Sequence, residues 1–180
     1  MKSAKYFFIV LLILICSRVY PFPAEVTPLN DGNYFKTVHS MLAKAKKSIY
    51  VIMYSATYYE KYPDSLSNRL INNLISAKKR GLEVKAILDQ AEDNKTSGSA
   101  ENKKVADMLS RAGVNTYLDE KEITTHSKLV IIDGRYVIIG SANWSYYALS
   151  KNNETNVLIN SEQVAKEYIK YFEEIAALCK

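Results

Sequence analysis

Strand-like and helix-like patterns alternate along residues 31–118, and this order constrains the fold more than any other feature of the chain. Residues 47–54 form a mostly apolar run, which is typical of a buried strand, and residues 82–89 form a second strand pattern. Residues 31–47 and 65–80 carry apolar side chains at the spacing of one helix face. Because parallel strands need a crossover between them, usually a helix, we expect an α/β sandwich with a largely parallel sheet in this half.

Residues 90–118, which follow the second strand, are expected to be a loop followed by a short helix–strand unit. Residues 90–100 are polar and contain a Ser-Gly-Ser sequence, which favours a loop. A short helix is expected over 103–112 and a strand over 114–118.

Short strands follow one another in the second half, without a helix between them. Apolar runs over 128–132 and 136–139 flank Asp133-Gly134, a dipeptide typical of a two-residue hairpin turn. A further strand is expected over 155–159, and an amphipathic helix over 161–178 closes the chain.

The first 24 residues have the pattern of a secretory signal. Lys2 and Lys5 precede an apolar run over residues 6–16, and these 11 residues are too few to span a bilayer, which needs about 20. We expect residues 1–24 to be a signal peptide or N-terminal anchor and residues 25–180 to form one domain. The protein is then exported, to the periplasm or the medium, and an uncleaved apolar run would associate it with the membrane.

Composition limits the class of protein. Without residues 1–24 the formal net charge falls from +5 to +2, so overall charge is not that of a strongly basic nucleic-acid-binding protein. Of the two cysteines, Cys16 lies in the expected signal and leaves Cys179 without an internal partner. A disulfide-stapled scaffold is therefore excluded, and the case for any substrate must come from local groups.

The segment from His126 to Asn143 carries the clearest chemical signal. It reads H-x-K-x4-D-x6-G-S-x-N and occurs once in the chain. If Asp133-Gly134 is a two-residue turn, strand register places Ser141 directly opposite His126. Lys128 and Asn143 then share their face, because alternate residues of a strand point the same way. Four polar groups would converge through register alone.

This set of groups suits the cleavage of a phosphodiester. Lys128 and Asn143 can hold the non-bridging oxygens, with help from the Ser141 hydroxyl. A neutral His126 can attack phosphorus and form a covalent phosphohistidine. A second group must protonate the leaving oxygen, and a twofold-related His126 in a homodimer is its simplest source. His39, the other histidine, is expected to be a surface or partly packed residue of the first helix.

These residues resemble the HKD motif of the phospholipase D superfamily, and residues 45–54 and 77–89 are similar to the family's first strand and helix–strand unit. The resemblance covers roughly residues 28–178. It implies an α-β-α sandwich with a mixed, mostly parallel central sheet, a phosphohistidine intermediate, and neither metal nor cofactor. Most members carry two HKD copies, whereas small one-copy bacterial endonucleases of this length dimerise to build one site at the interface.

The resemblance also implies roles for two further residues. Glu154 matches a downstream glutamate that orients the histidine, and Asp133 matches a mainly structural position. Independently of the resemblance, Gly140 lies where backbone is expected to approach a ligand closely.

Aromatic residues near the motif are candidate substrate contacts. Tyr54 and Tyr58 follow the first strand, and Trp144 follows Asn143. Such rings suit base stacking, but equally suit a lipid interface or the core. The sequence favours an exported, metal-independent endonuclease that cleaves DNA, with single-stranded DNA or RNA as other substrates. A phospholipase D or cardiolipin-type lipid hydrolase stays open, as does a non-catalytic nucleic-acid-binding module.

Overall fold

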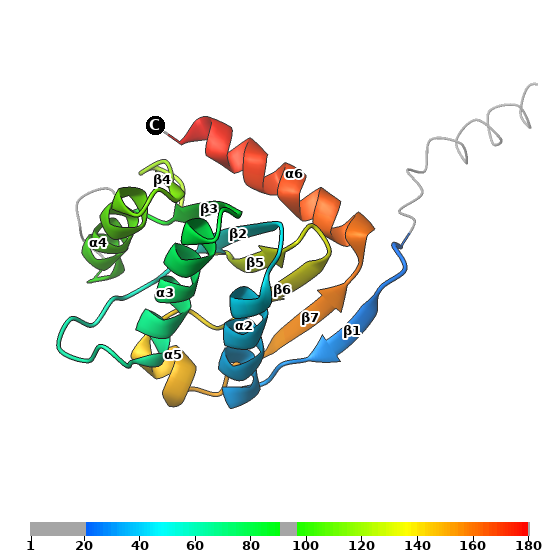
Figure 1. Ribbon diagram of the computed structural model, residues 1–180, viewed down its shortest axis with the longest axis horizontal. Coiled ribbons are helices and arrows are strands. Elements are labelled where there is room, and N and C mark those ends of the chain that lie inside the picture. The colour runs from blue at the N-terminus through cyan, green and yellow to red at the C-terminus, as the bar shows by residue number, and fades with distance from the viewer. Residues whose placement is uncertain (1–20, 91–96, 180) are drawn as a thin grey trace, which may run out of the picture.

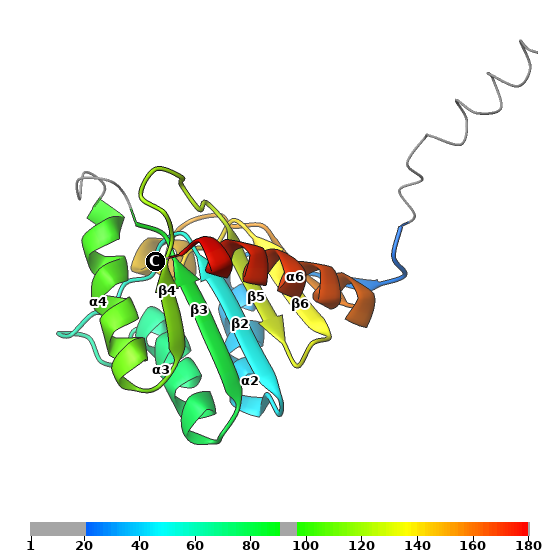
Figure 2. The same ribbon diagram turned by 90° about the horizontal axis from the view of Figure 1, so that it is seen from above.

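The computed structural model describes residues 21–90 and 97–179, so the core of the expected signal segment lies outside the described residues. The chain forms one seven-stranded sheet with helices on both faces (Figure 1, Figure 2). Across the sheet the strands are β1 (Glu25–Pro28), β7 (Asn156–Asn160), β6 (Tyr136–Gly140), β5 (Lys128–Ile132), β2 (Ser48–Met53), β3 (Glu83–Leu88) and β4 (Asn115–Leu118). The helices are α2 (Gly32–Lys44), α3 (Leu66–Lys79), α4 (Ser97–Arg111), α5 (Tyr146–Ser150) and α6 (Glu162–Leu178). The expected α/β sandwich is confirmed.

Parallel pairing is restricted to β2–β3 and β3–β4, where helices α3 and α4 provide the crossovers. The other neighbours pair antiparallel, because β5, β6 and β7 follow one another through short connections and β5 joins β2 antiparallel. The sheet is mixed, as expected, but the expected majority of parallel pairs is corrected to a majority of antiparallel ones.

Two apolar layers hold the helices to the sheet. Helices α2, α3 and α4 cover one face, and α6 crosses the other (Figure 2). Successive residues of β2 pack alternately into the two layers, with Val51 on the α2 side and Ile52 on the α6 side. Phe172 is fully buried under α6, where its ring meets Tyr50 edge-on. Within the described parts of the chain, none of the helices has the length and apolar character needed to cross a membrane.

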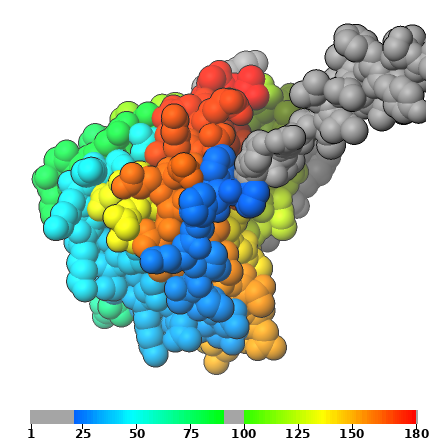
Figure 3. Space-filling view, turned by 90° about the vertical axis from the view of Figure 1, so that its right-hand side faces the viewer, coloured from blue at the N-terminus to red at the C-terminus, as the bar shows by residue number. Residues whose placement is uncertain are grey.

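Several elements differ from the sequence-based expectation. Strand β1 was not expected, because its four residues are all exposed and include Pro28. It pairs with β7 at the edge of the sheet, and Figure 3 shows it in blue on the molecular surface. Helix α5 was also not expected, and α4 begins at Ser97 rather than at residue 103. The polar, glycine-containing start of α4 gave no helical periodicity.

The hairpin turn between β5 and β6 contains three residues instead of two. Ile132 pairs with Tyr136, so the register is shifted by one from the expectation, and Ser141 does not lie opposite His126. Asp133 and Gly134 both adopt positive φ, of 57° and 64°. The Asp133 carboxylate accepts backbone N–H groups of residues 46–48 at 2.7–3.2 Å. This carboxylate ties the turn to the start of β2, which agrees with the expected structural role.

A pair of buried carboxylates fixes the segment that precedes β5. Asp89 and Asp119 both accept the backbone N–H of Thr125, at 2.7 and 3.1 Å. Asp89 is 5% exposed and Asp119 3% exposed. Burial, together with the neighbouring Asp119 charge, raises the pKa of Asp89 to about 6. By accepting the same N–H group, the two carboxylates hold Thr125, the residue before His126, in place.

Replacing Asp133 should destabilise the fold. Asp133→Ala removes the acceptor of three N–H groups and places alanine at positive φ, so we expect the free energy of unfolding to fall by about 1–3 kcal/mol. Asp133→Asn keeps one acceptor oxygen and tolerates the left-handed conformation, so it should lose clearly less. Urea denaturation measures both. Equal losses for the two variants would contradict this structural role.

The carboxylate pair should make stability depend on pH. A raised pKa means that protonated Asp89 favours the folded state below about pH 4, and that this contribution is lost as the pH rises through about 6. Asp119→Asn removes the neighbouring charge, so the fall in unfolding free energy over this window should become smaller. Urea denaturation at several pH values tests this, with exposed Asp107→Asn as the matched control. An unchanged pH dependence in Asp119→Asn would refute the pairing.

Candidate active site

The polar residues of the motif gather at one edge of the sheet, where β2 and β3 end and β5 begins. Lys128 opens β5 and pairs with Met53, the last residue of β2. The pairing continues one step further, because the Tyr54 N–H donates to the Ser127 carbonyl at 2.9 Å. Tyr54 and His126 therefore meet beyond the strand ends. His126 itself lies outside β5, so strand alternation does not determine its direction.

His126, Lys128 and Tyr54 form one contact group. The Lys128 Nζ lies 2.7 Å from the His126 carbonyl oxygen and 3.2 Å from its Nδ1. It also lies 4.6 Å from the centre of the Tyr54 ring, and that centre is 4.2 Å from the centre of the imidazole. His126 is exposed, whereas Lys128 is only 7% exposed. A buried cation thus lies directly beneath an accessible imidazole.

The position of Lys128 indicates which tautomer the His126 imidazole adopts in this structure. An ammonium group only donates, so Nδ1 accepts from it and the ring proton belongs on Nε2. Nucleophilic attack through Nε2 needs the opposite tautomer, and a bound phosphate that draws the ammonium away from Nδ1 would allow it. Burial lowers the pKa of Lys128, and the charges of Glu154 and Asp89 oppose that shift. Burial disfavours the uncompensated ammonium, and a bound phosphate would supply the counter-charge that it lacks.

Ser141 and Glu154 form a second group. The Ser141 hydroxyl donates to Glu154 and accepts the Thr155 N–H at 3.0 Å. The other carboxylate oxygen of Glu154 accepts from Asn152 at 2.9 Å. Glu154 is 8% exposed and is held by these donors rather than by His126. The expected Glu154–His126 pair is therefore not formed here, and the Ser141 hydroxyl is committed to the carboxylate rather than free for a phosphate.

Asn143 follows β6, in the segment that leads into α5. Its side-chain oxygen is buried and has no hydrogen-bond partner among the described residues. Since an amide turned by 180° presents its NH₂ group to the same place, Asn143 can offer either donor or acceptor to a ligand. Unsatisfied buried polar atoms are rare and need an explanation, and a phosphate oxygen would provide one. Asn143 therefore stays a ligand candidate.

Gly140 ends β6 where two strands approach closely. A Cβ placed on it would overlap the backbone of Thr155 and would lie 2.6 Å from the Asn156 Cα. The close approach expected at Gly140 is thus an approach to β7. It brings the Ser141 segment against the Glu154 segment.

The three candidate aromatic contacts have different environments. Tyr54 contacts His126 as described, and Tyr58 is partly buried against the α2-side core. Trp144 is 1% exposed and its Nε1–H donates to the Tyr34 hydroxyl at 3.1 Å. Trp144 is therefore corrected from a substrate contact to a core residue. The sequence pattern could not distinguish these roles, because all three follow strand ends.

The sequence did not indicate the role of Asn102, a buried residue of α4 that holds the backbone around the site in place. The Asn102 side chain donates to the Tyr54 and Asp89 carbonyls, both at 2.8 Å, and accepts the Ala56 N–H at 2.8 Å. It joins the ends of β2 and β3, the same ends that carry Tyr54 and Asp89. A lone polar residue on a helix gave no sequence signal for this role.

Comparison with known proteins identifies relatives of this chain. The family described as "Cardiolipin synthase, PLD-like domain" matches residues 38–176. A phospholipase D of Rickettsia typhi is 32% identical over 136 residues, which cover 75% of this chain and 59% of that protein. Cardiolipin synthase 1 of Staphylococcus epidermidis is 34% identical over 133 residues, which cover 74% of this chain and 25% of that protein. The chain thus spans about three fifths or less of the length of these curated relatives.

Solved structures extend the likeness over almost the whole described chain. Nuc from Salmonella typhimurium, a phospholipase D family member, matches with a TM-score of 0.72 and 25% identity, over 88% of this chain and 97% of that one. NucT from Helicobacter pylori shares the fold, with a TM-score of 0.68 and 19% identity over 87% of this chain and 98% of that one. With its single HKD motif at the edge of a mixed sheet, this chain belongs to the phospholipase D superfamily.

Proposed function

We propose that this protein is an exported, metal-independent phosphodiesterase. It is an endonuclease that cleaves DNA, with single-stranded DNA or RNA as further substrates, at a site shared by two subunits. The observation that carries the proposal is the contact between the accessible imidazole of His126 and the buried ammonium of Lys128. The first is a nucleophile and the second a fixed positive charge for a phosphate.

The two chemical steps follow from these groups. In the first step, an imidazole nitrogen of His126 attacks phosphorus, the bond to the leaving oxygen breaks, and a second imidazole gives that oxygen a proton. In the second step, the same second imidazole takes a proton from water, whose oxygen attacks phosphorus and breaks the P–N bond. Lys128 and Asn143 hold the non-bridging oxygens in both steps, so charge neutralisation at the phosphate comes from the protein itself.

We infer that the second imidazole comes from another subunit. His39 is stacked on Phe35 with ring centres 5.4 Å apart, and its two ring nitrogens contact Arg69 and Asn73. It lies on α2, in a helix–helix contact with α3 rather than at the strand ends. A twofold-related His126 meets the requirement, and in such a pair one copy attacks while the other protonates.

The surface beside His126 fits a subunit contact. Ile123, Tyr171 and Leu178 are 57%, 45% and 56% exposed, and all three line a pocket of about 150 Å³ together with His126. Exposed apolar groups gathered around a catalytic residue are typical of an interaction surface. We infer that a second copy covers this rim and brings its own His126 to the site.

A lipid hydrolase is the second candidate. The two curated relatives described above are called phospholipase D and cardiolipin synthase, and both exceed 30% identity to this chain. The apolar run at residues 6–16 would hold such an enzyme at a membrane. The same imidazole chemistry serves either substrate, so the substrate must be settled by assay. Single-stranded DNA, duplex DNA, RNA and phosphatidylglycerol or cardiolipin vesicles should be compared side by side.

His126→Ala should abolish cleavage of a single-stranded oligonucleotide in EDTA. The expected loss exceeds about 1,000-fold, because the substitution removes the atom that forms the covalent intermediate. His39→Ala is the matched control and should keep near-wild-type turnover per folded molecule. Circular dichroism establishes that both variants fold. Cleavage that requires added Mg²⁺, or cleavage that survives in His126→Ala, would contradict the mechanism.

Mixing subunits tests the shared site. When wild-type protein exchanges subunits with His126→Ala, each mixed dimer has one imidazole and should be inactive. Activity should then fall with the square of the wild-type fraction, whereas an independent monomer would keep activity in proportion to that fraction. Light scattering gives the oligomeric state, and mixing with His39→Ala provides the control. A fully active monomer would rule out the shared site.

A further inference from the structure

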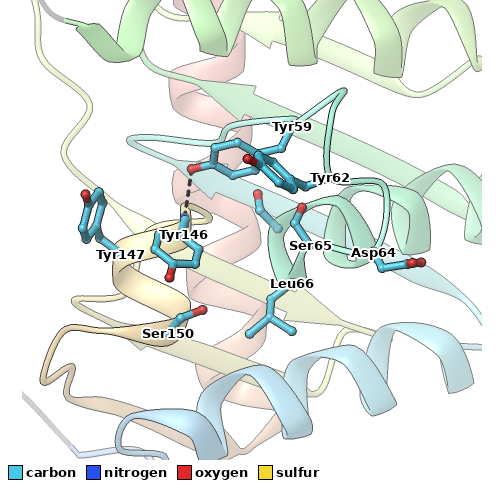
Figure 4. A pocket seen from close by; sticks show the side chains of 9 residues that line it. Tyr59, Tyr62, Asp64, Ser65, Leu66, Tyr146, Tyr147 and Ser150 are labelled. Carbon is cyan, nitrogen blue, oxygen red and sulfur yellow. Dashed lines mark hydrogen bonds between the residues drawn. The ribbon is translucent and has the colours of Figure 1, made fainter.

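Tyrosines surround a pocket that the phosphate chemistry does not use. The pocket has a volume of about 590 Å³ and is lined by Tyr59 and Tyr62 from the loop after β2, by Ser65 at the start of α3, and by Tyr146 and Tyr147 from α5. Figure 4 shows the rings of Tyr59, Tyr62 and Tyr146 among the side chains that line it. The volume lies within the roughly 300–1,000 Å³ that is typical of ligand pockets.

The walls of the pocket are direct continuations of the active-site segments. One wall follows Tyr54, the ring that touches His126, and the other begins three residues after Asn143. Because three residues extend at most about 11 Å, Tyr146 must lie close to Asn143. A polymer whose phosphate is held by Asn143, as proposed above, would therefore place a neighbouring group near the pocket.

Backbone hydrogen bonds fix the two walls to each other. The Trp144 N–H donates to the Ser55 carbonyl, and the Thr57 N–H donates to the Trp144 carbonyl, both at 2.9 Å. The Ser67 hydroxyl contacts the Thr57 and Trp144 carbonyls at 2.6 and 2.7 Å.

The tyrosines themselves add a further link. The Tyr146 N–H donates to the Tyr59 hydroxyl at 2.9 Å, the contact drawn as a dashed line in Figure 4. The pocket is therefore preformed rather than assembled by a ligand.

The rings are free to contact a ligand. Tyr62 and Tyr147 are each 68% exposed, and Tyr146 is 46% exposed. The Tyr146 and Tyr147 rings meet edge-on, with centres 5.4 Å apart. The Lys151 ammonium lies 6.0 Å from the Tyr146 ring centre and is not one of the lining residues. Proteins that bind single nucleic-acid strands stack bases on exposed aromatic faces of this kind and meet the phosphates with basic side chains.

The charge of the residues that line the pocket favours a neutral ligand over an anionic one. Among the described lining residues Asp64 is the one ionisable at neutral pH, and none is lysine or arginine. Lys151 lies outside this lining, so an anionic headgroup inside the pocket would meet the Asp64 carboxylate without a basic residue to offset it. Membrane-binding surfaces, in contrast, are typically basic. A neutral, planar ring avoids this repulsion and suits the tyrosine faces. We propose that this tyrosine pocket binds an unpaired nucleobase of the strand whose phosphate lies at His126.

This inference rests on the proposed nuclease function and adds a strand preference to it. A base that enters the pocket has left its partner, so a duplex must open before it can be bound in the same way. Cleavage of single strands should therefore be faster than cleavage of duplexes of the same sequence. The preference would arise from the tyrosines and not from the phosphate-binding residues.

Binding to two matched oligomers tests the pocket. The full chain carrying His126→Ala, in EDTA, is titrated with fluorescent oligothymidylate and with an abasic oligomer of equal length. Tyr62→Ala and Tyr147→Ala should each weaken oligothymidylate binding about 5- to 100-fold, the equivalent of one lost base stack, and should leave abasic binding unchanged. Tyr62→Phe and Tyr147→Phe should restore it. Val26→Ala, which trims an exposed apolar side chain on β1 in the same domain, should change neither.

The outcomes separate this inference from the proposed function. If the protein cleaves and binds single strands but the alanine variants bind both oligomers as before, the pocket assignment is wrong and the nuclease function stands. If the variants lose affinity for vesicles of phosphatidylcholine and phosphatidylglycerol while keeping oligothymidylate, the pocket is a lipid site and the inference is overturned. If the wild-type protein neither cleaves nor binds any nucleic acid, both proposals fail together.

Discussion

The antiparallel pairing of β5 with β2 is the contact on which the rest of the structure depends. Val130 pairs with Val51 at the centre of the sheet, and this joins the parallel half of the fold to its antiparallel half. The same pairing carries Lys128 to the end of β2 and places Tyr54 beside His126. A shift of one residue would turn the Lys128 side chain to the opposite face of the sheet. The buried apolar residues of both strands oppose such a shift, so the core fixes the position of Lys128.

The sequence predicted the elements better than it predicted their contacts. The strands around residues 48–53 and 128–132 were predicted closely, because continuous apolar runs report burial on both faces. The turn at Asp133 was predicted one residue too short, since the Asp-Gly signal does not report the three N–H groups that the carboxylate binds across the fold. Trp144 was misassigned for a related reason. Sequence position placed it near the site, whereas its hydrogen bond to Tyr34 and its burial are tertiary facts.

The site contains charges that the protein alone balances incompletely. Burial disfavours the charged form of Lys128, and no carboxylate makes a direct ion pair with it among the contacts that the structure describes. Glu154 and Asp89 act on it only at longer range, and each is engaged elsewhere, with Ser141 and with Thr125. Removing a buried cation from water costs free energy unless an anion compensates. A phosphate between Lys128 and the unpaired amide of Asn143 would compensate both groups at once, which is why the arrangement suits an anionic substrate.

The subunit contact and the base pocket that we propose use opposite faces of the sheet. The exposed apolar rim beside His126 includes Tyr171 and Leu178 of α6, which covers one face. The tyrosine pocket is built on α3 and α5, which pack against each other on the α2 side (Figure 1). A second copy that covers the α6 rim would therefore leave the pocket open. In a twofold pair each subunit would offer one such pocket to a strand that passes the shared phosphate site, so both flanks of the cleaved bond would meet tyrosines. Such a pair would accept only a strand that is single and extended at the site, because paired bases cannot reach two separate pockets.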